Sequence, residues 1–417
     1  MNTKQCSLLA VSILLASQAH SAGFQVAEHS ASGLGRAFSG EGAIADNASV
    51  LARNPAAMMR FEQAAFSGAI SFIDPEIDVK DVSNNEQSND IAPFQVAPAS
   101  YYIAPINQRW AWGLGLFTNY GVATDYPSDI SAGDMAGNTS LRSVNLNPNI
   151  AYRLNEFWSF GAGVNLVYAE AELTRYKGET TTASGGKAYD KLIGMTGETF
   201  GYGWNIGTLY ELDEDNRFSL AYRSAVNLDF DDGKFNSYSS GIAPEPTVTG
   251  RLKIELPAII ELSGFHQLNS QWAVHYSWQR TDWSTFTKLE ATSPTCTNPS
   301  TGIQGQCFYK AEDYNDNDRL SVGATYQLNK EWTLRAGYAF DEQAGKATLS
   351  IPDSDRHWYS SGFTYQWSPA LSFDAGFALV MSDNGSFKET NALGQERTFE
   401  SQGRAFISSI QINYAFN

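Results

Sequence analysis

Apolar and polar residues alternate along much of the chain between residues 64 and 417. In Trp158–Ala169 the large apolar side chains fall at positions 158, 160, 164, 166 and 168, and small or polar residues lie mostly between them. Phe218–Phe230 repeats this pattern, with apolar residues at 218, 220, 222, 226, 228 and 230. Successive side chains on a strand point to opposite faces, so each stretch predicts a strand with one apolar and one polar face. This alternation is typical of a transmembrane β-barrel, which turns its apolar face toward lipid.

Six short turns divide residues 64–417 into seven segments, each long enough to cross a membrane, form a loop and return. Seven such hairpins predict a 14-stranded antiparallel barrel, all-β in class, with short periplasmic turns and longer extracellular loops. Most turns have Leu before them and an aromatic residue after them. The turns are Asn107–Trp110, Asn155–Trp158, Asp213–Asn216, Asn269–Trp272, Asn329–Trp332 and Trp367–Ala370. The expected extracellular loops are Asp81–Asp90, Thr124–Asn138, Gly178–Glu198, Asp231–Gly250, Ala291–Asp313, Asp341–Asp355 and Ser382–Gln402.

The N-terminal 63 residues lack this alternation. Leu8–Ala16 is a short apolar run followed by Ala19-His20-Ser21, a small-x-small cleavage site, so residues 1–21 are predicted to be a secretory signal peptide. Residues 22–63 are rich in Gly, Ala and Ser. A 14-stranded barrel has a lumen that leaks unless something occupies it. We therefore expect residues 22–63 to form a plug, or hatch, inside a barrel of residues 64–417.

Charge and cysteine content narrow the function further. The net charge of −17 argues against nucleic-acid binding. Acidic loops are expected to be solvated surface, with a cation bridge from Asp313–Asp318 to lipopolysaccharide as the alternative. Cys296 and Cys307 lie in a Thr-, Pro- and Gly-rich loop of an exported chain, which predicts a disulfide. The histidines are scattered without metal-ligand spacing, so neither a metal site nor a cofactor is expected.

Several stretches resemble the FadL family of outer-membrane long-chain fatty acid transporters. The N-terminal stretch Ser32–Asp46 and the run Arg53-Asn54-Pro55-Ala56 resemble the family's hatch. Further matches keep their order along the whole mature chain: Ile73-Asp74-Pro75, Ala104–Asn107, Thr118–Gly121, Ala151–Asn155 and Ile351–Arg356. The resemblance implies a monomeric outer-membrane channel that takes up hydrophobic molecules by passive, ligand-gated diffusion. In this family the substrate leaves sideways, where the third strand kinks inward.

The resemblance also implies roles for particular residues. Thr118, Asn119, Tyr120 and Gly121 are expected at the lateral opening, because glycine inside a strand permits a bulge. Arg175 is the candidate for the fatty acid carboxylate. The family's second basic residue has no clear counterpart, and Lys310 and Arg319 flank an acidic stretch there. We take Lys310 as the second head-group candidate.

Binding and release both have to be possible for a channel to transport. Burial contributes about 0.8 kcal/mol per methylene, so a long acyl chain binds tightly and its release becomes difficult. Phe24 is the candidate for a mobile apolar group that reshapes the pocket. Asn54, Pro55 and Ala56 are expected to anchor the hatch near the barrel floor.

Two other functions remain open at this point. One is a channel of the same family for aromatic hydrocarbons or other hydrophobic compounds. The other is an outer-membrane lipid hydrolase with His275 as its base, which we disfavour because its catalytic groups would have to face lipid near the rim. We therefore expect a transport protein and no catalytic residues.

Overall fold

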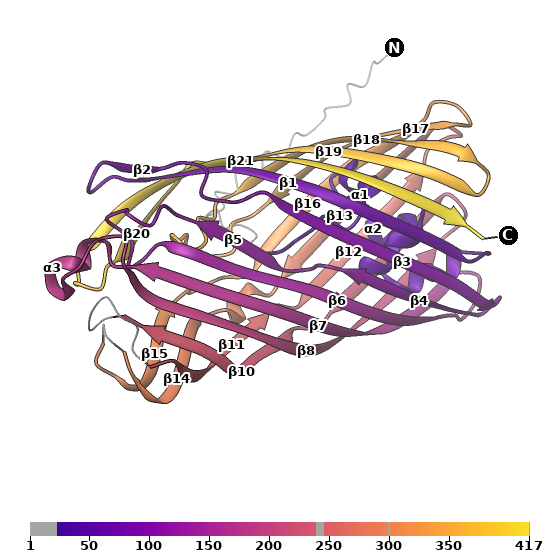
Figure 1. The fold of residues 1–417 in the computed structure, drawn as a ribbon. Coiled ribbons are helices and arrows are strands. Elements are labelled where there is room, and N and C mark those ends of the chain that lie inside the picture. Colours follow the sequence, from indigo (N-terminus) through magenta and orange to yellow (C-terminus); the bar gives the residue numbers. More distant parts are fainter. Residues whose placement is uncertain (1–22, 239–245, 299–300, 417) are drawn as a thin grey trace, which may run out of the picture.

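Fourteen antiparallel strands close into a barrel in the computed structural model, which describes residues 23–238, 246–298 and 301–416 (Figure 1). The predicted signal peptide lies outside these residues. Each strand of the ring pairs with the next, and the last pairs with the first. The ring runs β1 (Ala65–Asp81), β3 (Gln95–Asn107), β4 (Trp110–Phe117), β6 (Gly137–Arg153), β7 (Trp158–Tyr176), β8 (Lys191–Glu211), β9 (Asn216–Arg223), β12 (Ile259–Gln267), β13 (Trp272–Thr281), β16 (Asn317–Gln327), β17 (Trp332–Asp341), β18 (Arg356–Ser368), β19 (Leu371–Ser382) and β21 (Glu396–Ala415).

Seven further strands extend or decorate this ring at its extracellular end. They are β2 (Glu86–Ser88), β5 (Gly121–Asp125), β10 (Val226–Ser237), β11 (Val248–Leu256), β14 (Lys288–Thr297), β15 (Gln304–Ala311) and β20 (Gly385–Thr390). The helical elements are short: α1 (Ala31–Leu34), α2 (Glu41–Ile44), η1 (Ala48–Ala52), η2 (Pro55–Arg60), η3 (Gly178–Thr180), α3 (Thr181–Ser184) and η4 (Trp283–Thr285). No helix in the described part of the chain is long and apolar enough to cross a membrane.

The alternation predicted for the strands places apolar side chains on the outer wall. Trp158, Phe160 and Val164 on β7 are exposed, whereas Asn165, directly after Val164, is buried and faces the lumen. The same holds on the last strand, where Phe406, Ile410 and Ile412 face outward. An apolar outer face and a polar inner face are what a lipid-embedded barrel requires.

Five of the six short turns share one hydrogen-bond pattern. The side-chain oxygen of the Asn or Asp that opens the turn accepts from the backbone N–H groups two and three residues later. In the turn at Asn269 these N···O distances are 2.9 Å to Gln271 and 3.0 Å to Trp272. Asx side chains mimic a backbone turn in this way, which explains why the turns recur with Asn or Asp at the same place. The other turns of this kind open at Asn107, Asn155, Asp213 and Asn329.

Three of the predicted extracellular loops contain long stretches of strand. Much of Asp231–Gly250 and Ala291–Asp313 belongs to strands β10, β11, β14 and β15, which pair with one another beyond the ring. Most of Ser382–Gln402 belongs to β20 and β21, which pair with each other. Turn-forming residues there do not end the strands, because the backbone groups continue to find partners on the neighbouring strand. Phe218–Phe230 is likewise not one continuous strand. It breaks at Ser224-Ala225, and Val226, Leu228 and Phe230 are buried on the inside instead of facing lipid.

The hatch fills the lumen in the half of the barrel nearest the short turns (Figure 1). The α1 helix packs against β18, β19 and β21, and η2 packs against β6, β7 and β8. Leu51, Ala56 and Met58 of the hatch are fully buried and belong to one apolar cluster with Tyr101 and Ile103 of the barrel wall. The hatch and the wall therefore share a core, as the prediction of an internal plug requires.

Candidate functional site

The wall is interrupted on the third strand of the ring, between β4 and β5. The side chain of Thr118 donates to the carbonyl of Ser143 (2.8 Å), and the Ser143 hydroxyl donates to the carbonyl of Tyr120 (2.6 Å). These bonds replace the regular ladder to β6. Beyond the break β5 pairs with β6, and Gln95–Ala99 of β3 pair with β1 but have no ladder partner on the β5 side among the described residues.

The N-terminal end of the hatch pairs with this interruption. Gln25 forms a β-bridge with Tyr120. The Gly121 N–H donates to the Phe24 carbonyl (2.9 Å), and the Val26 N–H donates to the Asn119 carbonyl (2.7 Å). Tyr120 and Gly121, which the sequence placed at the opening, therefore contact Phe24, the residue proposed as the mobile group, and Asn119 contacts Val26 beside it. We call residues 23–26 the gate segment.

The role expected of Gly121 needs a physical correction. Its φ is not positive, and an added Cβ would meet its nearest atom, the Leu141 carbonyl oxygen, at 3.4 Å, an ordinary contact. The interruption is thus not made by glycine's conformational freedom. The side chains of Thr118 and Ser143 make it, and the Gly121 N–H is used to hold the gate segment.

A cavity of about 740 Å³ lies at the interruption, and we call it the window cavity. Gly23, Gln25 and Val26 of the hatch line one side of it. Val96, Leu116 and Val144 line it as well, and these side chains are 51%, 43% and 44% exposed on the outer wall. A cavity lined by both lumen and outer-wall residues crosses the wall of the barrel.

A second, smaller cavity of about 80 Å³ lies on the other side of the gate segment, and we call it the inner cavity. Its lining is almost entirely apolar and includes Phe230, Phe235 and Phe286. Val122, Leu141 and Ile351 line both cavities, so the two adjoin.

Phe24 separates the inner cavity from the window. Its side chain is only 4% exposed, and its ring lies edge-on to those of Trp283, Phe286 and Tyr120, with centroid distances of 4.6, 5.4 and 6.1 Å. Trp283 was not identified from the sequence, because it lies outside every segment that resembles the family.

The two basic candidates converge on one residue. The Arg175 Nη2 donates to the Ser350 hydroxyl (2.8 Å), and the Lys310 Nζ donates to the same oxygen (2.9 Å). Ser350 in turn lines the inner cavity. Lys310 also lies 3.6 Å from the Glu389 carboxylate. The sequence did not single out Ser350, although it immediately precedes the Ile351–Arg356 stretch that resembles the family.

A buried carboxyl group lies close to these cations. Glu312 follows β15, outside the strands that form the ring, and is 1% exposed. Neither of its carboxylate oxygens has a hydrogen-bond partner among the described residues. Burial raises the pKa of the Glu312 carboxyl to about 7, partly offset by the nearby charge of Lys310.

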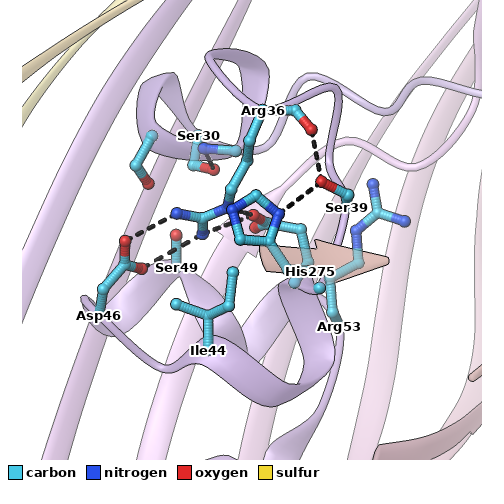
Figure 2. Close-up of polar contacts among 12 residues, drawn as sticks. Ser30, Arg36, Ser39, Ile44, Asp46, Ser49, Arg53 and His275 are labelled. Atoms are coloured by element: carbon cyan, nitrogen blue, oxygen red, sulfur yellow. Dashed lines mark hydrogen bonds and ion pairs between the residues drawn. The ribbon is translucent and has the colours of Figure 1, made fainter. Parts of the chain in front are cut away.

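A network of ion pairs fixes the rest of the hatch (Figure 2). Arg36 pairs with Asp46 (2.8 Å) and donates through Nε to Glu41 (2.8 Å), and Arg335 of β17 pairs with Asp46 as well (3.1 Å). Arg53 pairs with Glu261 of β12 (3.1 Å). These contacts hold the hatch to two separate parts of the wall.

The Asn54-Pro55-Ala56 turn sits against two glycines of the wall. Asn54 donates to the carbonyls of Gly42 (2.9 Å) and Thr208 (3.0 Å) and accepts from the Ala56 N–H (3.0 Å). A Cβ on Gly161 would meet the Ala56 nitrogen at 2.5 Å, and one on Gly207 would meet Asn54 Oδ1 at 2.1 Å. The turn is therefore seated where the wall has no side chains.

His275, the base of the hydrolase alternative, belongs to the hatch contacts. Its Nδ1 is hydrogen-bonded to Ser39 (2.7 Å) and its Nε2 to Thr325 (3.1 Å), and it is 2% exposed (Figure 2). The Ser39 hydroxyl is also hydrogen-bonded to the Arg36 carbonyl (2.7 Å). The pair is thus enclosed between hatch and wall, and both ring nitrogens of His275 are engaged in hydrogen bonds.

The remaining candidates lie at the extracellular end. Cys296 and Cys307 form a disulfide that closes the β14–β15 hairpin. In the acidic stretch, Asp316 and Asp318 pair with Arg280 at 3.2 and 3.3 Å. The described residues contain no cluster of three or more His, Cys, Asp or Glu suited to a metal ion. A cation bridge to lipopolysaccharide at this stretch stays a prediction.

Comparison with known proteins decides the family. Residues 12–416 match the model of the outer membrane protein transport protein family (OMPP1/FadL/TodX). The chain belongs to this family. It is 38% identical to a long-chain fatty acid transport protein of Escherichia coli K12, with 98% of each chain covered, and 37% identical to outer membrane protein P1 of Haemophilus influenzae, with 98% of this chain and 99% of that one covered.

Solved structures show the same fold. A FadL homologue of Pseudomonas aeruginosa superposes with a TM-score of 0.83 at 22% identity, covering 95% of this chain and 100% of that one. The toluene transporter TodX of Pseudomonas putida gives a TM-score of 0.70 at 18% identity, covering 94% of this chain and 99% of that one. The protein is therefore an outer-membrane β-barrel of a transport family, and not an enzyme.

Proposed function

We propose that this protein takes up long-chain fatty acids across the outer membrane and releases them sideways between β3 and β5. The observation that carries the proposal is the window cavity, which crosses the wall and adjoins the apolar inner cavity. The long-chain fatty acid transport protein of Escherichia coli, at 38% identity, supports the choice of substrate.

The two cavities suit the two requirements of transport. The inner cavity removes an acyl chain from water, which contributes about 0.8 kcal/mol per methylene. At about 80 Å³ it is much smaller than the window cavity, so a long chain requires it to enlarge. Displacing Phe24 enlarges it and at the same time opens it toward the window.

The gate segment couples these events. Because the Gly121 N–H donates to the Phe24 carbonyl, displacing Phe24 also frees the edge of β5 at the opening. An acyl chain that displaces Phe24 thereby opens its own exit, and the inner cavity binds it less tightly once Phe24 no longer lines it. Binding strong enough to enter and weak enough to leave then follows from one movement.

Arg175 and Lys310 are assigned to the carboxylate. Both donate to Ser350, at 2.8 and 2.9 Å, at the edge of the inner cavity. A carboxylate that displaces the Ser350 hydroxyl would accept charge-assisted hydrogen bonds, which are roughly twice as strong as neutral ones.

Oleate uptake in cells that lack their own transporter tests the proposal. Gly121→Pro removes the N–H that holds the gate segment and is expected to change uptake, whereas Gly121→Ala keeps the N–H and fits the available space, so it is the matched control. Arg175→Glu places a negative charge at the head group and is expected to abolish high-affinity uptake. Wild-type uptake in both Gly121→Pro and Arg175→Glu, at normal barrel assembly, would contradict the proposed route.

A channel for aromatic hydrocarbons is the second candidate. One observation favours it: both terminal nitrogens of Arg175 are already engaged, Nη1 by the Asn138 and Thr174 carbonyls and Nη2 by Thr139 and Ser350. With its terminal nitrogens engaged, Arg175 does not offer them to a carboxylate, and the inner cavity then holds a ligand mainly through apolar contacts. Competition binding separates the two candidates. Tight binding of oleate that toluene displaces poorly supports the fatty acid, whereas tight binding of toluene that oleate displaces poorly supports the hydrocarbon.

A further inference from the structure

A groove of about 480 Å³ lies on the outer wall of the barrel and shares Ile407 of its lining with the window cavity. Its sides are the rings of Phe72, Phe94, Tyr359, Phe377 and Phe406. Ser361 and Ser408 also line it, and their short side chains leave room between the rings. We call this the outer groove.

The outer groove begins at the edge of the window. Phe72 of β1 is the ladder partner of Val96 of β3, and Val96 lines the window cavity. The Phe72 ring stacks on that of Phe94, with centroids 6.4 Å apart and planes inclined by 23°. Phe94 lies just before β3 and Phe72 lies on the neighbouring β1, so both are next to Val96. An acyl chain that passes Val96 on leaving the barrel therefore meets Phe94 and Phe72 next.

A positively charged side chain, Arg404, lies between the window cavity and the outer groove. Arg404 on β21 lines the window cavity, and its guanidinium lies 5.4 Å from the centroid of the Phe406 ring, which lines the outer groove. Arg404 also donates to the Glu76 carboxylate (2.6 Å), but both side chains are largely exposed, at 57% and 44%. Because both side chains lie on the outer surface, a carboxylate at the edge of the groove can reach Arg404 and compete with Glu76 for it.

The charged residues around the outer groove also determine which way an acyl chain would lie in it. Asp74 lines the groove and is the ladder partner of Phe406, two residues from Glu76 along β1. A carboxylate inside the groove would meet this negative charge, whereas one at Arg404 would not. An acyl chain therefore fits with its head group at Arg404 and its tail among the rings, toward Ser408 and Ser361.

We propose that the outer groove is an external binding site for the transported fatty acid, which it receives on leaving the window. The ligand is a long-chain carboxylate, bound through Arg404 and the five aromatic rings. This inference rests on the proposed function, since the fatty acid has to leave between β3 and β5 to reach the groove. The groove would hold the released chain beside the window before it spreads into the membrane.

Site-specific quenching tests the inference in proteoliposomes. Ser408→Cys places a thiol in the groove, and Ala324→Cys is the matched control, because Ala324 lies in the same ladder row through Ala336, Ser361 and Phe377 but four strands away. Each thiol carries a fluorophore, and the probe is a stearic acid with a nitroxide near its methyl end. Ser361→Cys is the second groove position in case Ser408→Cys assembles poorly, and heat-modifiable migration reports assembly of each variant.

The expected result is quenching several-fold greater at position 408 than at 324 while the probe is being transported. Arg404→Gln removes the charge that holds the head group and is expected to weaken this contact several-fold. Arg280→Gln, which removes another outward-facing arginine paired with Asp316 and Asp318, is expected to leave it unchanged.

Two results would overturn the inference while leaving transport intact. One is equal quenching at positions 408 and 324 together with normal uptake of the probe. The other is a preference for position 408 shown equally by a nitroxide phospholipid in the bilayer, which would make the groove an ordinary lipid contact. Absence of uptake by assembled wild-type protein would instead refute the proposed function, and with it the inference.

Discussion

Phe24→Ala is the substitution that tests the gate segment most directly. The Phe24 ring is 4% exposed and lies edge-on to three aromatic rings. Replacing a buried Phe by Ala costs about 3–5 kcal/mol where the site cannot collapse, and the two backbone hydrogen bonds to Gly121 and Asn119 stay possible. Taking the lower figure, the free energy for detaching residues 23–26 falls by about 3 kcal/mol, which is on the order of a hundredfold in the detached population.

Hydrogen exchange measures this population at two defined amides. The Gly121 N–H is bonded to the Phe24 carbonyl and the Val26 N–H to the Asn119 carbonyl, so both exchange when the segment detaches. We expect both to exchange on the order of a hundred times faster in Phe24→Ala. Phe235→Ala enlarges the same inner cavity from β10 and is the control, because it leaves the segment in place. Unchanged protection in Phe24→Ala, or equal loss in Phe235→Ala, would refute the reasoning.

Three further predictions concern the turns, the disulfide and the buried carboxyl. Asn269→Ala removes two turn hydrogen bonds and should lower the unfolding free energy by about 1–2 kcal/mol in urea titrations, whereas Asn269→Asp should not, since Asp213 serves the equivalent turn. Replacing both Cys296 and Cys307 by Ser opens a loop of sequence separation 11 and should destabilise the β14–β15 hairpin by about 3 kcal/mol, seen as faster proteolysis there with uptake unchanged. Burial raises the pKa of the Glu312 carboxyl to about 7, so the group is neutral below that pH and charged above it. The charged carboxylate competes with the ligand for Lys310 and Arg175, so oleate affinity should fall as the pH rises through 7. Glu312→Gln should remove that fall. A pH dependence that persists in Glu312→Gln would assign it to another group.

The alternation and the turns predict the barrel well because both follow from local rules. Two-residue periodicity determines which residues share a face, and the Asn or Asp at each turn forms its hydrogen bonds within four residues. Periodicity does not, however, say which face meets lipid. On β9 Leu220 faces outward, but after the break at Ser224-Ala225 the same periodicity buries Val226 and Phe230. That reversal depends on tertiary contacts, which a local pattern cannot report.

The candidate site divides in the same way. Resemblance to the family indicated Phe24, Arg175 and the Thr118–Gly121 stretch, and the structure places Phe24 against that stretch. It did not indicate Ser350 or Trp283, because each acquires its place only when distant strands and loops come together. The outer groove could not be predicted from the sequence for a related reason. Phe406 is far from Phe72 and Phe94 in the sequence, and only the barrel closure between β1 and β21 brings it beside them.

The hatch has two parts that differ in how firmly they are held, and this difference argues for a sideways route. Arg36, Asp46 and Arg335 form a largely buried chain of ion pairs, and Arg53 adds a second with Glu261. Removing one partner of a buried pair costs about 3–5 kcal/mol, so moving the whole hatch would break several such contacts at once. The gate segment is held by its two backbone hydrogen bonds to Asn119 and Gly121, by the rings around Phe24, and by hydrogen bonds of Gly23 and Gln25 with side chains of the barrel. None of its four residues carries a charged side chain, so no ion pair has to be broken to move it. This difference supports the proposed route, in which the gate segment moves, the wall opens at Gly121 and the ion-paired body of the hatch keeps the lumen closed to water.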